Sequence, residues 1–183
     1  AGDEAPLCLS ADGTELYLRR TVKNQTNLYV SRFEQGVWQK PEPLGNINSL
    51  FDETGISVTS DGNTLIFCSN RDKGEGGMDL YSCTKDEKGK WSSPRNLGEK
   101  INTSGDEINP YIYPNGKKLF FSSSGHYDKN MGGFDVLFTE LQNDGTWSQP
   151  ENVGYPINST ADDLYYYVAS DGKRYVASVS DKM

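Results

Sequence analysis

Short apolar segments recur along the chain, and residues that favour turns separate them. Three of these segments are Leu16-Tyr17-Leu18, Leu65-Ile66-Phe67 and Leu119-Phe120-Phe121. Short continuous runs of this kind are typical of strands that are covered on both faces. No long segment has the 3.6-residue period of an amphipathic helix. The pattern therefore predicts an all-β protein.

An acidic pair and a turn dipeptide precede each apolar run. The turn is Asp-Gly or Asn-Gly, and it follows nine residues after the first acid in all four copies. Both dipeptides readily take positive φ at the two central positions of a two-residue hairpin. Each unit is therefore expected to begin with a strand, a tight turn and a second strand. The pairs are Asp3-Glu4, Asp52-Glu53, Asp106-Glu107 and Asp162-Asp163, and the turns are Asp12-Gly13, Asp61-Gly62, Asn115-Gly116 and Asp171-Gly172.

The remainder of each unit predicts two more strands. In the second and third units a Gly-Gly pair precedes the third strand, and we expect it to let the backbone turn sharply before Asp79 and Asp135. The fourth strand carries Trp, Pro and Gly at a shared spacing. Since proline is tolerated in a sheet mainly at an edge, this strand is expected to be the outermost. The tryptophans at positions 38, 91 and 147 are expected to pack between repeats.

Four strands per repeat, with one edge strand and two apolar faces, describe a blade of a β-propeller. A blade cannot bury both faces alone, so neighbouring blades must cover them. The predicted fold is an all-β propeller of four-stranded antiparallel blades, with three complete blades plus part of a fourth. The blades are expected at about 3–51, 52–105 and 106–161, with the partial one at 162–183. Because propellers need about four to eight blades, this single region is expected to belong to a larger propeller.

The linked motifs resemble a known repeat. Ser10-x-Asp-Gly and the Gly-Gly-x-Asp-Leu-Tyr of residues 76–81 are similar to the WD-like repeat of TolB. The Trp-x-x-Pro-x-x-Leu-Gly and Ile-Asn-Thr segments resemble the propeller domain of PorE-like, OmpA-family periplasmic proteins of Bacteroidetes. The resemblance implies a non-catalytic protein-binding or scaffolding module in the periplasm, associated with the outer membrane. Its implied partners are envelope or type IX secretion components, and peptidoglycan would be bound only through a separate OmpA-like domain.

Net charge and cysteine spacing exclude some classes of partner and of metal site. The chain of 183 residues has 26 acidic and 18 basic residues, which argues against nucleic acid and anionic membranes as partners. No apolar run approaches the roughly 20 residues that cross a bilayer, so direct membrane insertion is not expected. Cys8, Cys68 and Cys83 match no metal motif. Cys68 and Cys83 lie on neighbouring predicted strands, so they form either one disulfide or two small buried apolar side chains.

Catalytic residues are not predicted. His126 is the single histidine, and no Gly-x-Ser-x-Gly motif accompanies it. No catalytic residue, metal ligand or cofactor is therefore expected. A glycoside hydrolase-like propeller is an alternative, because such enzymes need only two carboxylates. The arginine cluster that a sialic acid carboxylate requires is not evident in the sequence.

Repeat geometry gathers one set of candidate binding residues. In a propeller the first strand of each blade lines the central channel, and the connection entering it shares a face with the loop between the second and third strands. Carboxylates there would attract cations or basic peptide segments. The competing interpretation is structural, because Asp and Glu at a strand entry can accept backbone N–H bonds. The candidates are Asp52, Glu53, Asp106, Glu107, Asp162, Asp163, Arg71, Asp72, His126 and Tyr127.

A second binding function uses different residues. A carbohydrate or peptidoglycan-fragment binder would stack sugars on exposed aromatic rings. Tyr165, Tyr166, Tyr167 and the tryptophans are the candidates for this role. Burial of all of them would argue against it.

Overall fold

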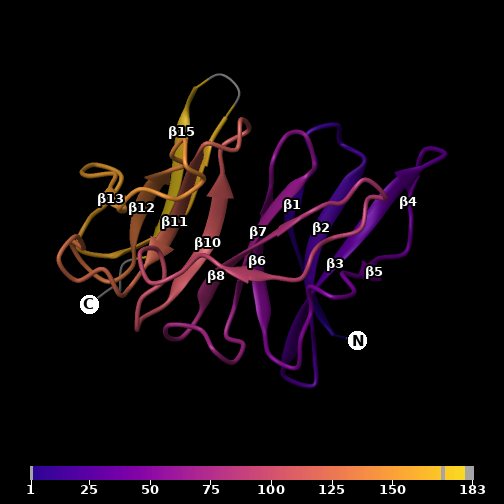
Figure 1. Cartoon of the computed structure of the whole chain (residues 1–183), viewed down its shortest axis with the longest axis horizontal. Coiled ribbons are helices and arrows are strands. Elements are labelled where there is room, and N and C mark those ends of the chain that lie inside the picture. The colour runs from indigo at the N-terminus through magenta and orange to yellow at the C-terminus, as the bar shows by residue number, and fades with distance from the viewer. Residues whose placement is uncertain (1, 170–171, 180–183) are drawn as a thin grey trace.

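The computed structural model describes residues 2–169 and 172–179, and every regular element in them is a β-strand (Figure 1). The strands form four antiparallel sheets, one for each sequence repeat. The first sheet contains β1 (Asp3–Leu9), β2 (Glu15–Val22), β3 (Gln25–Glu34), β4 (Val37–Trp38) and β5 (Glu42–Pro43). The second contains β6 (Glu53–Val58), β7 (Thr64–Ser69), β8 (Asp79–Thr84) and β9 (Arg95–Asn96).

The third and fourth sheets repeat this order. The third contains β10 (Glu107–Ile112), β11 (Lys118–Ser123), β12 (Asp135–Glu140) and β13 (Glu151–Asn152), and the fourth contains β14 (Asp162–Val168) and β15 (Arg174–Val179). The short strands β9 and β13 pair only with β8 and β12, which confirms the prediction of an outermost fourth strand. The all-β fold with three full blades and two strands of a fourth is also confirmed.

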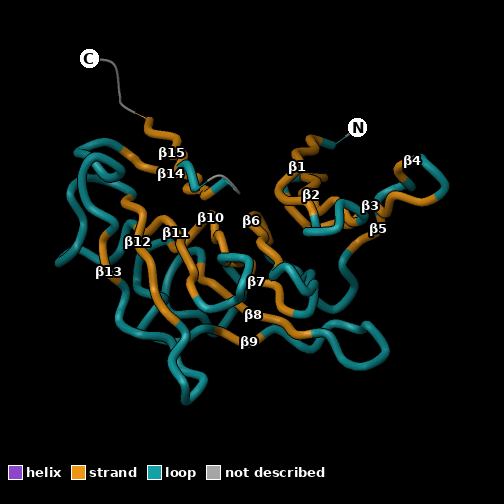
Figure 2. Tube along the Cα trace, turned by 90° about the horizontal axis from the view of Figure 1, so that it is seen from above, coloured by secondary structure: helices purple, strands orange, loops and turns teal. Residues whose placement is uncertain are grey.

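The sheets are arranged as a curved fan. Figure 2 shows β1, β6, β10 and β14 along its concave side, with β9 and β13 on the outside. Successive blades pack face to face through three clusters of buried side chains. β7 serves two clusters, because Leu65 and Phe67 face the first blade while Ile66 and Cys68 face the third. This alternation explains why consecutive residues from Leu65 to Cys68, at the centre of β7, are all apolar and buried.

Two of the three tryptophans fill the spaces between blades. Trp91 packs against the first cluster and Trp147 against the second, as predicted. Trp38 occupies the corresponding position in the first blade, where no preceding blade covers it. It is half exposed, and its ring lies beside that of Phe33, with centroids 5.2 Å apart.

The cysteines are free thiols. Cys83 pairs with Leu65 and Cys68 with Leu80 across β7 and β8, so the two thiols lie three positions apart in register. An odd offset places them on opposite faces of the sheet, where Cys83 joins the first cluster and Cys68 the second. The disulfide alternative is therefore wrong, and the buried apolar alternative holds.

The hairpins differ from the prediction. In the first hairpin the N–H of Gly13 donates to Ser10 O (2.9 Å) and the N–H of Ser10 donates to Glu15 O (2.8 Å). Only the glycine has positive φ, at 74°, so the turn is a type I turn closed by a left-handed glycine. Gly62, Gly116 and Gly172 have the same conformation, while Asp171 lies outside the described residues. Two-residue hairpins with positive φ at both positions are therefore the wrong expectation.

The Gly-Gly pairs also act differently. None of the four glycines at 76, 77, 132 and 133 has positive φ. Instead, a Cβ on Gly132 would lie 2.5 Å from the carbonyl carbon of Thr160, and one on Gly76 would lie 2.5 Å from that of Ser104. These glycines allow close approach of the backbone that leads into the next blade, rather than a sharp turn.

Candidate functional site

The first acid of each later repeat binds the preceding blade. Asp52 Oδ1 accepts a hydrogen bond from the Thr26 N–H (2.7 Å). Asp106 Oδ1 accepts one from the Met78 N–H (2.7 Å). Asp162 Oδ1 accepts one from the Phe134 N–H (2.9 Å). These carboxylates are partly exposed, and each fastens the entry of a third strand to the neighbouring blade.

The second acid of each later repeat is buried. Glu53, Glu107 and Asp163 are at most 1% exposed. Each accepts hydrogen bonds from the backbone N–H and the hydroxyl of a Ser or Thr four residues earlier. The prediction that both acids of each pair face the channel mouth is wrong for these three residues, because the strand-entry turn folds over them. Glu4 of the first repeat is exposed.

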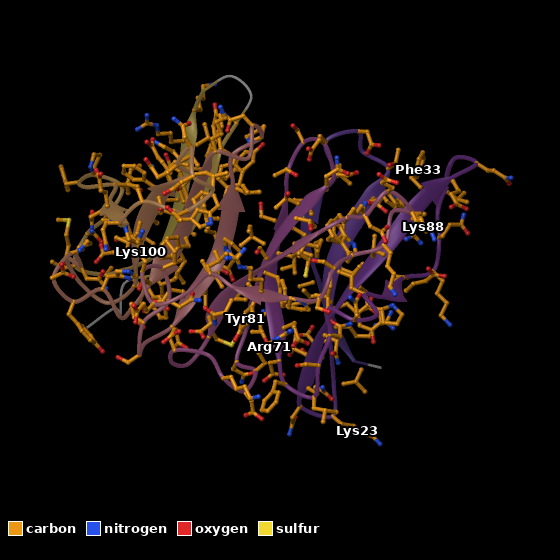
Figure 3. The ribbon with its side chains drawn as sticks, in the orientation of Figure 1. Lys23, Phe33, Arg71, Tyr81, Lys88 and Lys100 are labelled. Carbon is orange, nitrogen blue, oxygen red and sulfur yellow. The ribbon has the colours of Figure 1, made fainter. Side chains whose placement is uncertain are left out.

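Arg71 partners the buried acid of the second blade. Its Nη2 lies 3.0 Å from Glu53 Oε1 and donates to Ile47 O at 2.7 Å. The guanidinium lies over the rings of Phe67 and Tyr81, at 5.0 and 4.9 Å from their centroids. Figure 3 shows Arg71 beside Tyr81. Arg71 is therefore held inside the blade and is not offered to a ligand.

His126 holds the same place in the third blade. Its Nδ1 lies 2.9 Å from Ser123 Oγ and 3.7 Å from Glu107 Oε1. Burial lowers the pKa of His126 and raises the pKa of Glu107. The serine lies between the histidine and the carboxylate, whereas a hydrolytic triad has the histidine in the middle. The loops after the second strands, which carry Arg71 and His126, therefore lie beside the acidic pairs, as the repeat geometry predicts.

Asp72 and Tyr127 lie beside these anchors and are exposed. Tyr127 has 77% of its surface free. A binding role for these two residues and for Asp52, Asp106 and Asp162 stays a prediction.

A groove on the concave side is the feature that the repeat pattern did not predict. It has a volume of about 630 Å³ and runs across the four innermost strands and the turns beside them. Among the described residues that line it, none is Asp, Glu, Lys or Arg, although 24% of the chain is charged. The lining residues are Pro6–Leu9, Ala11, Gly55–Val58, Ser60, Asn109–Pro114, Tyr165–Ala169 and Gly172.

Exposed tyrosines give the groove its polar groups. Tyr165 is 56% exposed and Tyr167 50%, whereas Tyr166 is buried. Tyr167 meets Tyr111 edge to face, with centroids 5.3 Å apart. Of the aromatic candidates, Tyr165, Tyr167 and Trp38 are exposed. Only the two tyrosines line the groove. The consecutive tyrosines were the signal in the sequence, but the face on which each lies depends on a bulge that the sequence does not reveal.

That bulge recurs in the inner strands. Register shifts interrupt the pairing of β6, β10 and β14 at the same place. The residue at the bulge is Gly55, Asn109 or Tyr165, and the last two have φ of 51° and 56°. Left-handed backbone is tolerated by asparagine but is unfavourable for a tyrosine. Residues with such strained backbone cluster at functional sites, which makes Tyr165 a candidate binding residue.

The described residues hold neither a metal-binding cluster nor a membrane-spanning helix. They contain no group of three or more His, Cys, Asp or Glu side chains arranged to hold a metal ion. Residues 2–169 and 172–179 also contain no helix that could span a membrane.

Comparison with known proteins supports the fold. No protein-family model and no curated protein matches the sequence. A TolB-like protein from Agrobacterium tumefaciens superposes with a TM-score of 0.64 at 18% identity, covering 93% of this chain and 52% of that one. TolB from Acinetobacter baumannii gives 0.62 at 14% identity, covering 98% and 38%. An endo-arabinase from Bacteroides thetaiotaomicron gives 0.55 at 17%, covering 97% and 69%.

These similarities concern architecture. At such identities they show the fold alone, and propellers host many activities. The chain spans about half of the first TolB-like structure and less of the second. The described residues therefore have the fold of a partial, TolB-like β-propeller.

Proposed function

We propose that this protein is a non-catalytic propeller that binds an extended, uncharged segment of a partner protein in the groove. The observation that carries the proposal is the lining of the groove. It consists mainly of apolar and tyrosine side chains, with Ser57, Ser60 and Asn109, and has no charged side chain among its described residues. Desolvating a charged ligand there would be unfavourable, because nothing compensates its charge. An uncharged peptide avoids that penalty.

The groove offers both components of peptide recognition. Aromatic rings and prolines give flat apolar surfaces, which suit proline-rich or aliphatic segments. The β-bulges leave backbone groups beside Gly55, Asn109 and Tyr165 outside the regular ladder. An extended backbone can pair with such groups, while its side chains contact Tyr165 and Tyr167. Basic peptides, which an acidic mouth would attract, are not the expected ligands.

The placement of the protein is part of the same proposal. The sequence resemblance supports a periplasmic, outer-membrane-associated protein with envelope or secretion components as partners. The coverage of the TolB structures supports a larger propeller, in which this groove would form one wall of the central channel.

Carbohydrate binding is the second candidate. It is favoured by one observation, the exposure of Tyr165 and Tyr167 side by side in an open groove. Sugars stack on such rings, and a peptidoglycan fragment would present both sugar and peptide. A glycosidase would need two facing carboxylates, and the described lining of the groove contains no carboxylate.

A binding experiment separates these functions. The full chain is titrated with uncharged proline-rich peptides, acidic and basic peptides of equal length, muropeptides and arabino-oligosaccharides, and binding is measured by calorimetry. The proposal expects binding of the uncharged peptides and a loss of about five- to tenfold in Tyr167→Ala. Tyr155→Ala is the matched control, because Tyr155 is exposed but lies outside the groove. Saccharide binding that Tyr167→Ala abolishes, without peptide binding, would establish the second candidate instead.

A further inference from the structure

The loop residue beside the second acid of the repeat differs between the second and third blades. In the first blade Arg20 pairs with Glu4 from the strand position that Ser69 and Ser123 hold in the later blades. In the second, Arg71 pairs with Glu53 and lies over Phe67 and Tyr81. In the third, His126 lies near Glu107 and beside Phe121, at 6.0 Å between centroids. The second blade therefore holds a permanent cation where the third holds a group that titrates.

The hydrogen bonds around His126 restrict where protons can be. Ser123 Oγ lies 2.7 Å from Glu107 Oε1 and 2.9 Å from His126 Nδ1. The same oxygen accepts the Gly125 N–H at 3.1 Å. A serine hydroxyl has one proton, so it can donate to the carboxylate or to the imidazole but not to both. A backbone hydrogen bond with Lys100 raises the pKa of His126. We assign this bond, and the proton it needs, to Nε2, because Nδ1 faces Ser123.

Counting protons separates three states of the pair. With one shared proton, the bonds run either from a charged His126 through Ser123 to the carboxylate, or from a protonated Glu107 through Ser123 to a neutral imidazole. With no shared proton, Ser123 can donate to only one of Glu107 Oε1 and His126 Nδ1, and the other acceptor faces a lone pair of Ser123 Oγ. With two shared protons, His126 is charged and Glu107 is protonated. Both oxygens of Glu107 already accept hydrogen bonds from Ser123 or Thr103, so its proton points at another donor. Only the one-proton state satisfies every group.

We propose that His126, Ser123 and Glu107 hold one shared proton and form a pH-sensitive latch for the loop of residues 125–133. The N–H groups of Lys129 and Asn130 both donate to His126 O, so the position of His126 sets the position of the loop. Loss or gain of a proton breaks a buried hydrogen bond and loosens this loop. The loop presents the exposed side chains of Tyr127 and Met131, so pH controls the order of that surface.

The charges around the pair set the direction of each effect. Burial is the main cause of both pKa shifts, and on its own loop Lys129 lowers while Asp128 raises the pKa of His126. From β8, Asp79 raises the pKa of Glu107. A raised pKa at Glu107 means that stability is lost as pH rises through the pKa it has in the folded protein. A lowered pKa at His126 means that stability is lost as pH falls through its folded pKa. The proton count, rather than these two shifts, places the closed latch between the two titration steps of the coupled pair.

The single histidine makes the proposal directly measurable. Imidazole nitrogen signals of the full chain, labelled at histidine, are followed by NMR across the pH range, together with hydrogen-exchange protection of the Gly125, Lys129 and Asn130 amides. We expect two titration steps at His126, and protection about three- to tenfold lower outside the window. The Arg71 amide is the internal control, because it donates to Ser69 Oγ as Gly125 does to Ser123 but lies beside a permanent cation.

Two variants complete the test. Glu107→Gln removes the second titrating group, so the imidazole is expected to titrate in one step. His126→Arg copies the second blade and should make loop protection independent of pH. A wild-type imidazole that titrates in a single step at the pKa of an exposed histidine, with constant loop protection, would overturn the proposal even where a variant fails to fold.

Discussion

The Met78 N–H donates to the carboxylate of Asp106 across 2.7 Å, although 28 residues separate the two in the chain. This bond joins the start of β8 in one blade to the start of β10 in the next. Equivalent bonds from Asp52 and Asp162 join the other pairs of blades. One recurrent acid thus acts as a clamp between blades.

Removal of this clamp is expected to destabilise the protein. Asp106→Ala leaves the Met78 N–H without an acceptor and should lower the free energy of unfolding by about 1–3 kcal/mol in urea titrations. Asp106→Asn keeps an acceptor oxygen and should lose less. Asp86→Ala is the control, because Asp86 accepts only the N–H groups of Lys88 and Lys90 in an exposed turn. Equal losses in Asp106→Ala and Asp86→Ala would contradict the clamp.

Close backbone approach at Gly132 gives a second prediction. Gly132→Ala forces a methyl group against the Thr160 backbone and should lower the free energy of unfolding by about 1–3 kcal/mol. Gly45→Ala is the matched control, since φ there is ordinary and no atom lies within 4 Å of the added Cβ. Its stability should change by less than about 1 kcal/mol. An unchanged free energy of unfolding in Gly132→Ala would show that the Thr160 backbone can move away from the added methyl group at little cost.

Replacing the strained Tyr165 is expected to change stability and affinity in opposite directions. Tyr165→Asn introduces the residue found at the same bulge of β10, where φ is also positive. The variant should be more stable to thermal unfolding by about 1 kcal/mol, and should bind the groove ligand more weakly. Tyr167→Asn, on the same strand without positive φ, should lose affinity without gaining stability. A Tyr165→Asn protein with unchanged affinity would remove this tyrosine from the site.

The first hairpin turn predicts an acid titration. The hydroxyl of Ser10 chiefly, with the N–H and hydroxyl of Thr14, lowers the pKa of Asp12 from 3.8 to about 2. A lowered carboxyl pKa stabilises the fold above the unfolded value, and this contribution is lost as pH falls from about 4 to about 2. Carboxyl NMR titration of Asp12 checks the value. Ser10→Ala should move it back toward 3.8.

Much of the fold was predictable because the repeat fixes strand order through local chemistry. The Trp-Pro-Gly spacing identified the edge strands, and the apolar second strands required blades on both sides. The hairpins were mispredicted because Asp-Gly suits both a type I′ turn and a type I turn closed by glycine. Strand residues on either side decide between the two, here through the bond from the Ser10 N–H to Glu15 O.

The candidate site was harder to predict. The sequence placed Glu53 and Glu107 beside Arg71 and His126, as the structure does. It did not reveal that Ser49 and Thr103 fold over those carboxylates and bury them. The groove depends on bulges that turn Tyr165 outward, and a single extra residue in a strand has no reliable sequence signature. Strand periodicity predicts faces only where pairing is regular.

The clamp carboxylates also bear on how the chain folds during its synthesis. Met78 and Phe134, which enter the third strands of their blades, receive their hydrogen-bond acceptors only 28 residues later. A ribosome adds those residues within a few seconds at roughly 5–20 per second. Until then the emerging blade has an open edge. We expect each blade to gain this bond once the first residues of the next repeat have been added, so that a pause before that point leaves the N–H of Met78 or Phe134 without its acceptor.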